Sequence, residues 1–135
     1  MFESKIQIRV RYAEADRMGF VYYGNYAAYF EVARVEALRQ MGITYKEMED
    51  RGILLPVLDY SVKFIKPAGY DDLLTIKTVI PEMPQARIKF EYETTNENNI
   101  LINKANTTLV FINKETMKPC PAPEYFLSHI REYFE

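Results

Sequence analysis

The residues with the clearest chemical potential lie between positions 13 and 34, in the segment AEADRMGFVYYGNYAAYFEVAR. Asp16 stands directly before an apolar, tyrosine-rich stretch, so we expect its carboxylate to face an apolar pocket. A carboxylate in such a pocket can act as a general base toward water or as a nucleophile toward an activated carbonyl. The residue types therefore favour acyl-transfer chemistry at Asp16, with both roles open.

The start of a predicted helix follows Asp16 closely and supplies the second requirement of acyl transfer. Asn25 is a favourable N-cap for a helix over residues 26–41, and Gly42 is placed to end it. The first N–H groups of a helix lack intrahelical acceptors and lie at its positive end, where they can stabilise an oxyanion. The alternative for Asp16 is structural, because an aspartate close to a glycine commonly caps its own turn.

Other hydrolase chemistries find little support in the remaining reactive residues. The single histidine, His129, lies in the last predicted helix and is expected at the surface, far in sequence from any candidate nucleophile. Cys120 lies between two prolines in what should be a rigid loop. No group of residues has metal-ligand spacing, and the glycines form no phosphate-binding motif. The sequence predicts neither a catalytic triad nor a metal or cofactor.

Composition narrows the class of protein further. A chain of 135 residues is expected to form one domain over residues 1–135. The net charge of −2 argues against a nucleic-acid-binding protein. One cysteine excludes an intrachain disulfide and suits a reducing compartment. Without an apolar leader or a membrane-spanning stretch, the expected location is the cytoplasm, with no membrane partner.

The pattern of apolar residues predicts an α+β protein. A long helix and a short second helix come early, four of the five strands follow, and an amphipathic helix comes last. The expected strands cover residues 5–12, 54–66, 73–82, 86–95 and 100–113, and the helices residues 26–41, 44–52 and 121–135. We expect an antiparallel sheet curled around the long helix. One face of such a sheet stays exposed, which favours a homo-oligomer.

The segment DRMGFVYYGNYAAYFEVAR resembles the signature D-x-x-G-x-V-x-[HY]-x-x-Y of hot-dog-fold acyl-CoA thioesterases of the 4-hydroxybenzoyl-CoA type. The later FIKPAGYDDLLTI resembles the same family, and the likeness spans roughly residues 5–115. The resemblance implies a hot-dog fold, in which a five-stranded antiparallel sheet wraps a long central helix, here with a C-terminal helix added. It also implies an acyl-CoA substrate and sites formed between the subunits of a homodimer or homotetramer.

The resemblance also implies roles for individual residues. Asp16 matches the catalytic carboxylate, Tyr23 the residue whose backbone N–H polarises the thioester carbonyl, and Gly19 the tight turn. The expected lining or backing of the acyl pocket consists of Val21, Tyr26, Tyr29 and Phe30. Many relatives carry histidine where this chain has Tyr23, so Asp16 lacks an imidazole beside it. The backbone N–H is unaffected by that difference.

Coenzyme A carries phosphates, and its binding therefore requires cations. Arg87 and Lys89 share one face of their predicted strand, and the family binds the nucleotide end near this strand. Further candidates are Lys63 and Lys66.

Two other carboxylates lie near the predicted site. Glu14 is expected to point to solvent, and Glu31 to pair with Arg34 on the long helix.

Two rival functions stay open. The chain could act on acyl groups carried by a protein instead of coenzyme A, or it could be a non-catalytic acyl-binding or scaffold protein.

Overall fold

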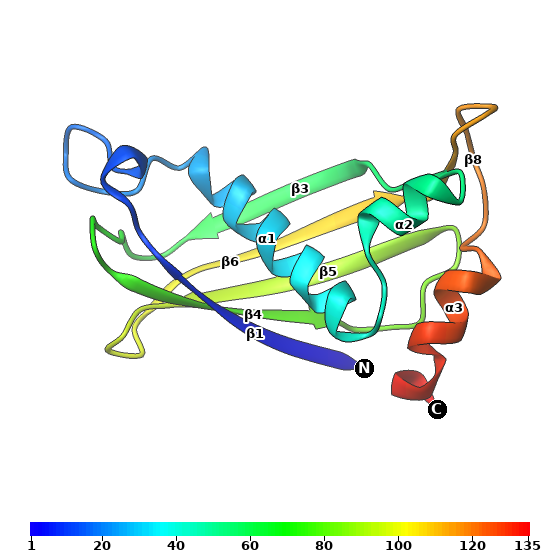
Figure 1. The fold of residues 1–135 in the computed structure, drawn as a ribbon. Helices are drawn as coiled ribbons and strands as arrows, with labels where there is room; N and C mark the ends of the chain where they lie inside the picture. Colours follow the sequence, from blue (N-terminus) through cyan, green and yellow to red (C-terminus); the bar gives the residue numbers. More distant parts are fainter.

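A five-stranded antiparallel sheet wraps around a long helix in the computed structural model, which describes residues 1–135 (Figure 1). The strands lie in the order β1-β4-β5-β6-β3. Their bounds are Phe2–Arg9 for β1, Val57–Phe64 for β3, Leu73–Ile80 for β4, Arg87–Thr95 for β5 and Leu101–Val110 for β6. The helix α1 (Asn25–Gln40) lies in the hollow of this sheet. The expected α+β architecture is confirmed.

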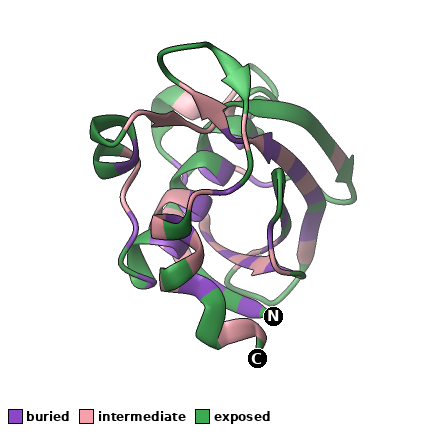
Figure 2. Ribbon diagram, turned by 90° about the vertical axis from the view of Figure 1, so that its right-hand side faces the viewer, coloured by how far each residue is buried: buried purple, intermediate pink, exposed green.

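Alternation of side chains along the strands gives the sheet one buried face. On β4 and β5 every second residue is buried, and these residues form the inner face that packs against α1 (Figure 2). The fully buried apolar residues of this face include Leu74, Ile76, Ile80, Ile88 and Phe90. The opposite face carries charged residues, among them the paired Lys77 and Glu93. The period of two therefore decides which side of each strand meets the helix.

Helix α1 presents a narrow face to the sheet. Ala33 and Ala37 are almost completely buried, and their small side chains let the helix backbone approach the strands closely. The helix ends as expected, since Gly42 follows it with a φ of +89°. The predicted N-cap was wrong: Asn25 is the first helical residue, and its side-chain amide donates to the Glu14 carbonyl at 2.9 Å. Gly24 occupies the cap position instead.

Two predicted strands are each divided between two sheets. Pro56 separates β2 (Ile53–Leu54) from β3, and β7 (Ile112–Asn113) continues beyond β6. These short strands form a second sheet in the order β2-β7-β8, with β8 at Lys118–Pro119. Proline has no N–H to donate and interrupts strand pairing, which explains the break at Pro56.

Two short helices, one after α1 and one near the C-terminus, lie at one end of the molecule (Figure 1). Thr44 caps α2 (Tyr45–Asp50) by accepting a hydrogen bond from the Glu47 N–H at 3.1 Å. The C-terminal helix α3 (Glu124–Ile130) continues as the 3₁₀ turn η2 (Arg131–Phe134), and another such turn, η1 (Tyr12–Glu14), follows β1. None of the helices combines the length and apolar character needed to cross a lipid bilayer.

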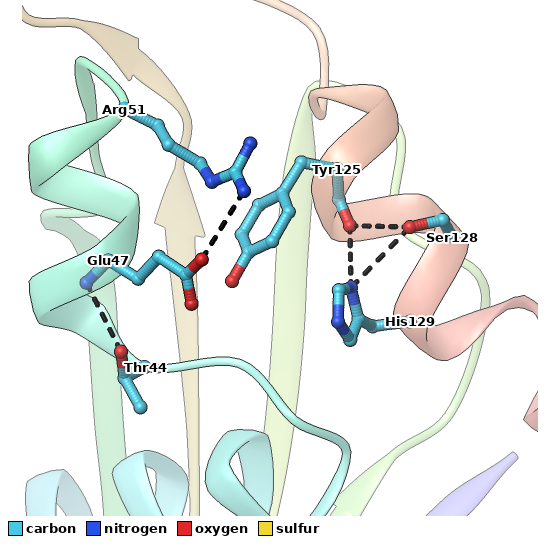
Figure 3. Close-up of polar contacts among 6 residues, drawn as sticks. All are labelled: Thr44, Glu47, Arg51, Tyr125, Ser128 and His129. Carbon is cyan, nitrogen blue, oxygen red and sulfur yellow. Dashed lines mark hydrogen bonds and ion pairs between the residues drawn. The ribbon is translucent and has the colours of Figure 1, made fainter.

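Polar contacts join α2 to α3 (Figure 3). The Arg51 guanidinium lies 4.0 Å from the centre of the Tyr125 ring, and Arg51 also pairs with Glu47 at 3.3 Å. The nearby Tyr125 hydroxyl, followed by the hydrogen bond from Arg51, lowers the pKa of Glu47. The expectation of a surface histidine was wrong, because His129 is half-buried with Nδ1 2.8 Å from the Tyr125 carbonyl. His129 therefore has a packing role between α3 and the end of α1.

Candidate active site

Asp16 begins a tight turn, and its two carboxylate oxygens differ in their contacts. Oδ1 accepts hydrogen bonds from the N–H groups of Met18, at 2.9 Å, and Phe20, at 3.2 Å. Gly19 has a φ of +83°, which glycine adopts without strain and which closes the turn. Oδ2 takes part in no hydrogen bond or ion pair and stays available. The structural alternative for Asp16 is thus correct for one oxygen only.

Asp16 also lines an apolar groove of about 300 Å³, so its expected position beside an apolar surface is confirmed. The groove lies between the turn, the start of α1 and the end of β3. Its other walls are Met18, Phe20, Val21, Tyr23, Tyr26, Phe64, Ile65, Lys66 and Pro67. Several of these side chains are well exposed, including Tyr23 and Phe64. The groove is therefore open along one side in a single chain.

Backbone N–H groups of Tyr23 and Gly24 lie unpaired at the start of α1. Neither donates a hydrogen bond, whereas the neighbouring N–H of Asn25 donates to the Tyr22 carbonyl at 2.9 Å. The Tyr23 side chain lines the same groove as Asp16. Asp16, with a free carboxylate oxygen, and Tyr23, with an unpaired amide at the positive end of a helix, therefore line one groove, whereas Gly24 lines the neighbouring hollow between α1 and β3.

Tyr26 forms the inner wall of the groove. Its ring is almost fully buried and lies 5.8 Å from the Phe64 ring, centre to centre. Burial, followed by the nearby Asp72 carboxylate, raises the pKa of Tyr26 to about 12, so its hydroxyl stays protonated at neutral pH. This wall is aromatic and carries a hydrogen-bond donor.

Glu14 points inward, and the expectation that it faces solvent was wrong. Its side chain is 13% exposed and pairs with Arg11 at 2.8 Å. The Tyr29 hydroxyl also donates to Glu14 Oε1 at 2.9 Å. Hydrogen bonding from Arg11 is the main cause that lowers the pKa of Glu14. Glu14 therefore connects η1 to α1 and lies outside the groove lined by Asp16.

Two predicted pocket residues lie outside this groove in the single chain. Tyr29 is directed toward Glu14, and Phe30 lines a separate hollow of about 450 Å³ between α1 and β3. Both project from helix turns that follow the one bearing Tyr26. Apolar spacing places residues on one face of a helix but does not say how far along it a groove extends.

The predicted ion pair between Glu31 and Arg34 is absent. Arg34 is 7% exposed and donates through Nε to the Tyr45 hydroxyl at 3.2 Å. Glu31 is exposed and forms no ion pair, although both residues border the hollow that contains Phe30. The loop after α1 brings Tyr45 to Arg34, and that tertiary contact replaces the helical pair.

The candidate phosphate-binding cations lie in three places. Lys66 borders the Asp16 groove. Arg87 and Lys89 line another hollow, of about 490 Å³, beside the turn between β4 and β5. That turn is at the opposite end of the sheet from the Asp16 turn (Figure 1). Lys63 is exposed on β3. One chain therefore brings only Lys66 to the groove.

The end of β3 supplies part of the site that residue types alone did not reveal. Phe64, Ile65 and Pro67 complete the groove, and the Val21 N–H donates to the Ala68 carbonyl at 2.8 Å. The signal available in the sequence was FIKPAGYDD, the second segment that resembles the thioesterase family. The residues of this segment that line the groove are mostly apolar, so a search for catalytic residue types did not identify it.

Comparisons with known proteins identify the family of this chain. Residues 10–130 match the family model described as Thioesterase-like superfamily. The acyl-CoA thioester hydrolase YbgC of Escherichia coli is 30% identical over 93% of this chain and 93% of its own. YneP of Bacillus subtilis, provisionally named an acyl-CoA thioesterase, is 35% identical over 88% of this chain and 86% of its own.

Solved structures share the whole fold. A DHNA-CoA thioesterase from Staphylococcus aureus superposes with a TM-score of 0.91 and 37% identity, covering 98% of this chain and 89% of its own. A 4-hydroxybenzoyl-CoA thioesterase has the same fold at 22% identity and a TM-score of 0.85, covering 96% and 99% of the two chains. The chain belongs to the Thioesterase-like superfamily, and it is a thioester hydrolase of the hot-dog fold.

Proposed function

We propose that this enzyme hydrolyses the thioester of a small acyl-CoA, with an aromatic or short-to-medium acyl group, and that Asp16 is its catalytic carboxylate. One observation carries the proposal. Asp16, with its unbonded Oδ2, and Tyr23, with its unpaired backbone N–H, line the same apolar groove. A thioester in that groove would meet an anionic oxygen and an oxyanion-stabilising donor together.

These groups allow two mechanisms of thioester hydrolysis. In the first, Asp16 removes a proton from water, and the resulting hydroxide attacks the carbonyl carbon. In the second, Oδ2 attacks that carbon directly, and water hydrolyses the resulting anhydride. In both, the Tyr23 N–H donates to the developing oxyanion and the carbon–sulfur bond breaks. Coenzyme A then leaves as its thiolate, which takes up a proton.

The groove lining favours an aromatic acyl group. Four of the ten lining residues carry aromatic rings: Phe20, Tyr23, Tyr26 and Phe64. Offset and edge-to-face ring contacts stabilise an aromatic ligand beyond simple burial of its surface. The Staphylococcus aureus relative, at 37% identity, is named for an aromatic acyl-CoA, which supports the same class here.

A second copy of the chain is the proposed partner. β3 is an edge strand whose residues are almost all exposed, among them Val57, Leu58 and Tyr60. Unpaired strand edges with apolar side chains are rarely left in water. A homodimer or homotetramer would cover this edge and close the open side of the groove. Lys66 is the nearest candidate for the coenzyme A phosphates, while Arg87 and Lys89 lie too far along the same chain.

The test is the substitution Asp16→Asn. Asparagine keeps the oxygen that accepts from Met18 and Phe20, so the turn is retained while the free carboxylate oxygen is lost. Hydrolysis of aromatic acyl-CoA should fall by about two orders of magnitude or more, measured by thiol release. The matched control is Glu31→Gln, which removes an exposed carboxylate on α1. Near-normal turnover by Asp16→Asn, or a collapse in the control alone, would reassign the catalytic carboxylate.

A carrier-protein thioesterase is the second candidate. ATL2 of Arabidopsis thaliana, an acyl-acyl carrier protein thioesterase, is 30% identical over 96% of this chain and 67% of its own. Comparing the same acyl group on coenzyme A and on a carrier protein distinguishes the two donors. Binding of either donor without thiol release would instead indicate a non-catalytic acyl-binding protein.

A further inference from the structure

Glu14 is the point at which the start of α1 is tied to the segment that carries Asp16. The Asn25 side-chain amide donates to the Glu14 carbonyl at 2.9 Å, and the Tyr29 hydroxyl donates to Glu14 Oε1 at 2.9 Å. The Tyr22 N–H donates to the same carbonyl at 3.0 Å. Glu14, Asn25 and Tyr29, here called the Glu14 cluster, therefore join the two segments through both the backbone and the side chain of one residue.

The hydrogen bonds of this cluster lie on either side of the two groups that the proposed chemistry uses. Asp16 follows Glu14 by two residues. Tyr23, whose N–H is unpaired, stands between Tyr22 and Asn25, and both of these donate to the Glu14 carbonyl. The separation between the Asp16 carboxylate and the Tyr23 N–H is thus spanned by a few covalent bonds and by these hydrogen bonds.

The carboxylate of Glu14 is held firmly. Oε1 accepts from the Arg11 N–H at 2.8 Å as well as from Tyr29, and Oε2 accepts from the Arg11 guanidinium at 2.8 Å. The Tyr29 side chain is buried. Burial, followed by the hydrogen bond to Glu14, raises the pKa of Tyr29, so its hydroxyl stays protonated and remains a donor. Hydrogen bonds to an ionised acceptor are stronger than those between neutral groups.

The other anchors of the Asp16 turn do not connect it to α1. The Asp16 N–H donates to the Phe20 carbonyl at 2.7 Å, which closes the turn on itself. The Val21 N–H donates to the Ala68 carbonyl at 2.8 Å, which ties the turn to the segment between β3 and β4. The alignment of Asp16 with the start of α1 therefore depends on the Glu14 cluster.

We propose that Asn25 and Tyr29 are positioning residues that act through Glu14. The cluster holds the Asp16 carboxylate at the separation from the Tyr23 N–H that attack on a thioester requires. None of its three members lines the groove, so the cluster governs the rate of the chemical step and not the binding of substrate. This inference rests on the proposed function, because it takes Asp16 as the catalytic carboxylate.

The first variant is Tyr29→Phe, which removes one hydroxyl and keeps the buried ring. The kcat for hydrolysis of benzoyl-CoA should fall about tenfold, because a small misplacement of a catalytic group slows the chemical step. KM should stay within about twofold of the wild-type value, because the groove lining is unchanged. Asn25→Ala removes the second tether independently and should lower kcat in the same way.

A double variant distinguishes positioning from general loosening of the fold. If Tyr29 acts through Asp16, its hydroxyl has nothing left to position once the carboxylate is gone. In the Asp16→Asn background, Tyr29→Phe should therefore change kcat by less than about twofold. A full tenfold loss in that background would show that Tyr29 acts independently of Asp16 and would overturn the inference.

The matched control is Tyr45→Phe. It removes another tyrosine hydroxyl that contacts a charged side chain of α1, because the Tyr45 hydroxyl accepts from Arg34 at 3.2 Å, away from the Asp16 turn. This variant should keep the wild-type kcat, and circular dichroism and thermal unfolding establish that each variant is folded. An equal fall in kcat for the control, or a wild-type kcat for Tyr29→Phe and Asn25→Ala, rejects the positioning role.

Failure of the proposed function gives a different result. If Asp16→Asn alone keeps near-normal turnover, or the folded wild type releases no thiol from benzoyl-CoA, the proposed function is rejected together with this inference. If Asp16→Asn loses activity while both tether variants keep theirs, only the positioning role is rejected.

Discussion

At the scale of single residues, the proposed catalytic role of Asp16 depends on the different roles of its two carboxylate oxygens. Oδ1 holds the turn by accepting hydrogen bonds from two backbone N–H groups, and those hydrogen bonds fix the direction of Oδ2. A carboxylate whose rotamer is held in this way loses little conformational freedom when a substrate binds. The same logic applies to Glu14, whose contacts with Arg11 and Tyr29 join the turn before Asp16 to α1.

The first residue-scale prediction concerns Glu14 and pH. Its pKa is lowered in the folded protein, mainly by the Arg11 hydrogen bond, below the ordinary value of 4.5. The charged form therefore stabilises the fold above pH 4.5, and that stabilisation is lost as the pH falls through the lowered pKa. Glu14→Gln should reduce the free energy of unfolding by about 1 kcal/mol at pH 7. The difference from wild type should shrink toward zero in acid.

Urea unfolding at a series of pH values measures this effect. Glu49→Gln serves as the control, because Glu49 is exposed and forms no ion pair. If Glu14→Gln lowers the free energy of unfolding by the same amount at pH 7 and in acid, the lost contact is not ionic.

At the scale of elements, the ends of α1 set the geometry of the site. The N–H groups of Tyr23, which lines the groove, and of Gly24 are free at its start, and its last turn passes into the left-handed Gly42. A Cβ at Gly42 would lie 3.0 Å from the His129 ring. That ring cannot easily move, because Nδ1 is 2.8 Å from the Tyr125 carbonyl. The end of α1 and the end of α3 are therefore fitted to each other.

Gly42→Ala should destabilise the protein more than Gly52→Ala. Both glycines have a φ above +80°, which costs an alanine about 1 kcal/mol. A Cβ at Gly52 meets nothing within 4 Å, so only Gly42→Ala also forces the His129 ring to shift. We expect about 1 kcal/mol more loss for Gly42→Ala, measured by thermal or urea unfolding. Equal losses would mean that the ring moves freely.

The elements also show what the sequence could and could not predict. Period-two alternation located β4 and β5 to within two residues at each end, because each strand has one buried and one solvated face. The break at Pro56 was missed, since apolar residues continue on both sides of it. Asn25 looked like a cap, but a tertiary bond to Glu14 takes its side chain. Contacts between distant segments, such as Phe64 beside Tyr26, have no local signal.

At the scale of the whole molecule, the exposed edge at β3 is the main unpaired surface. Val57, Leu58 and Tyr60 lie there in water in the single chain, next to the open side of the groove. Pairing of this edge with a second copy would satisfy the strand's free backbone groups and bury these side chains together. Assembly and activity should therefore depend on the same surface.

Leu58→Lys tests that dependence. A charge near the start of this exposed edge should weaken self-association at least about tenfold and lower the mass seen by light scattering. Ile100→Lys is the matched control, with a similarly exposed apolar residue in the turn between β5 and β6. Unchanged mass for Leu58→Lys would place the contact surface elsewhere on the molecule.

The absence of tryptophan from the chain turns the aromatic wall of the groove into an optical reporter. A Phe64→Trp substitution would give the protein a single indole at the wall, where the Phe64 ring now lies 5.8 Å from the Tyr26 ring, with no other tryptophan emission to subtract. Because the emission wavelength of an indole depends on its exposure to water, selective excitation of this indole would report movement of the wall. Ligand entry could then be followed in real time, before any bond is broken.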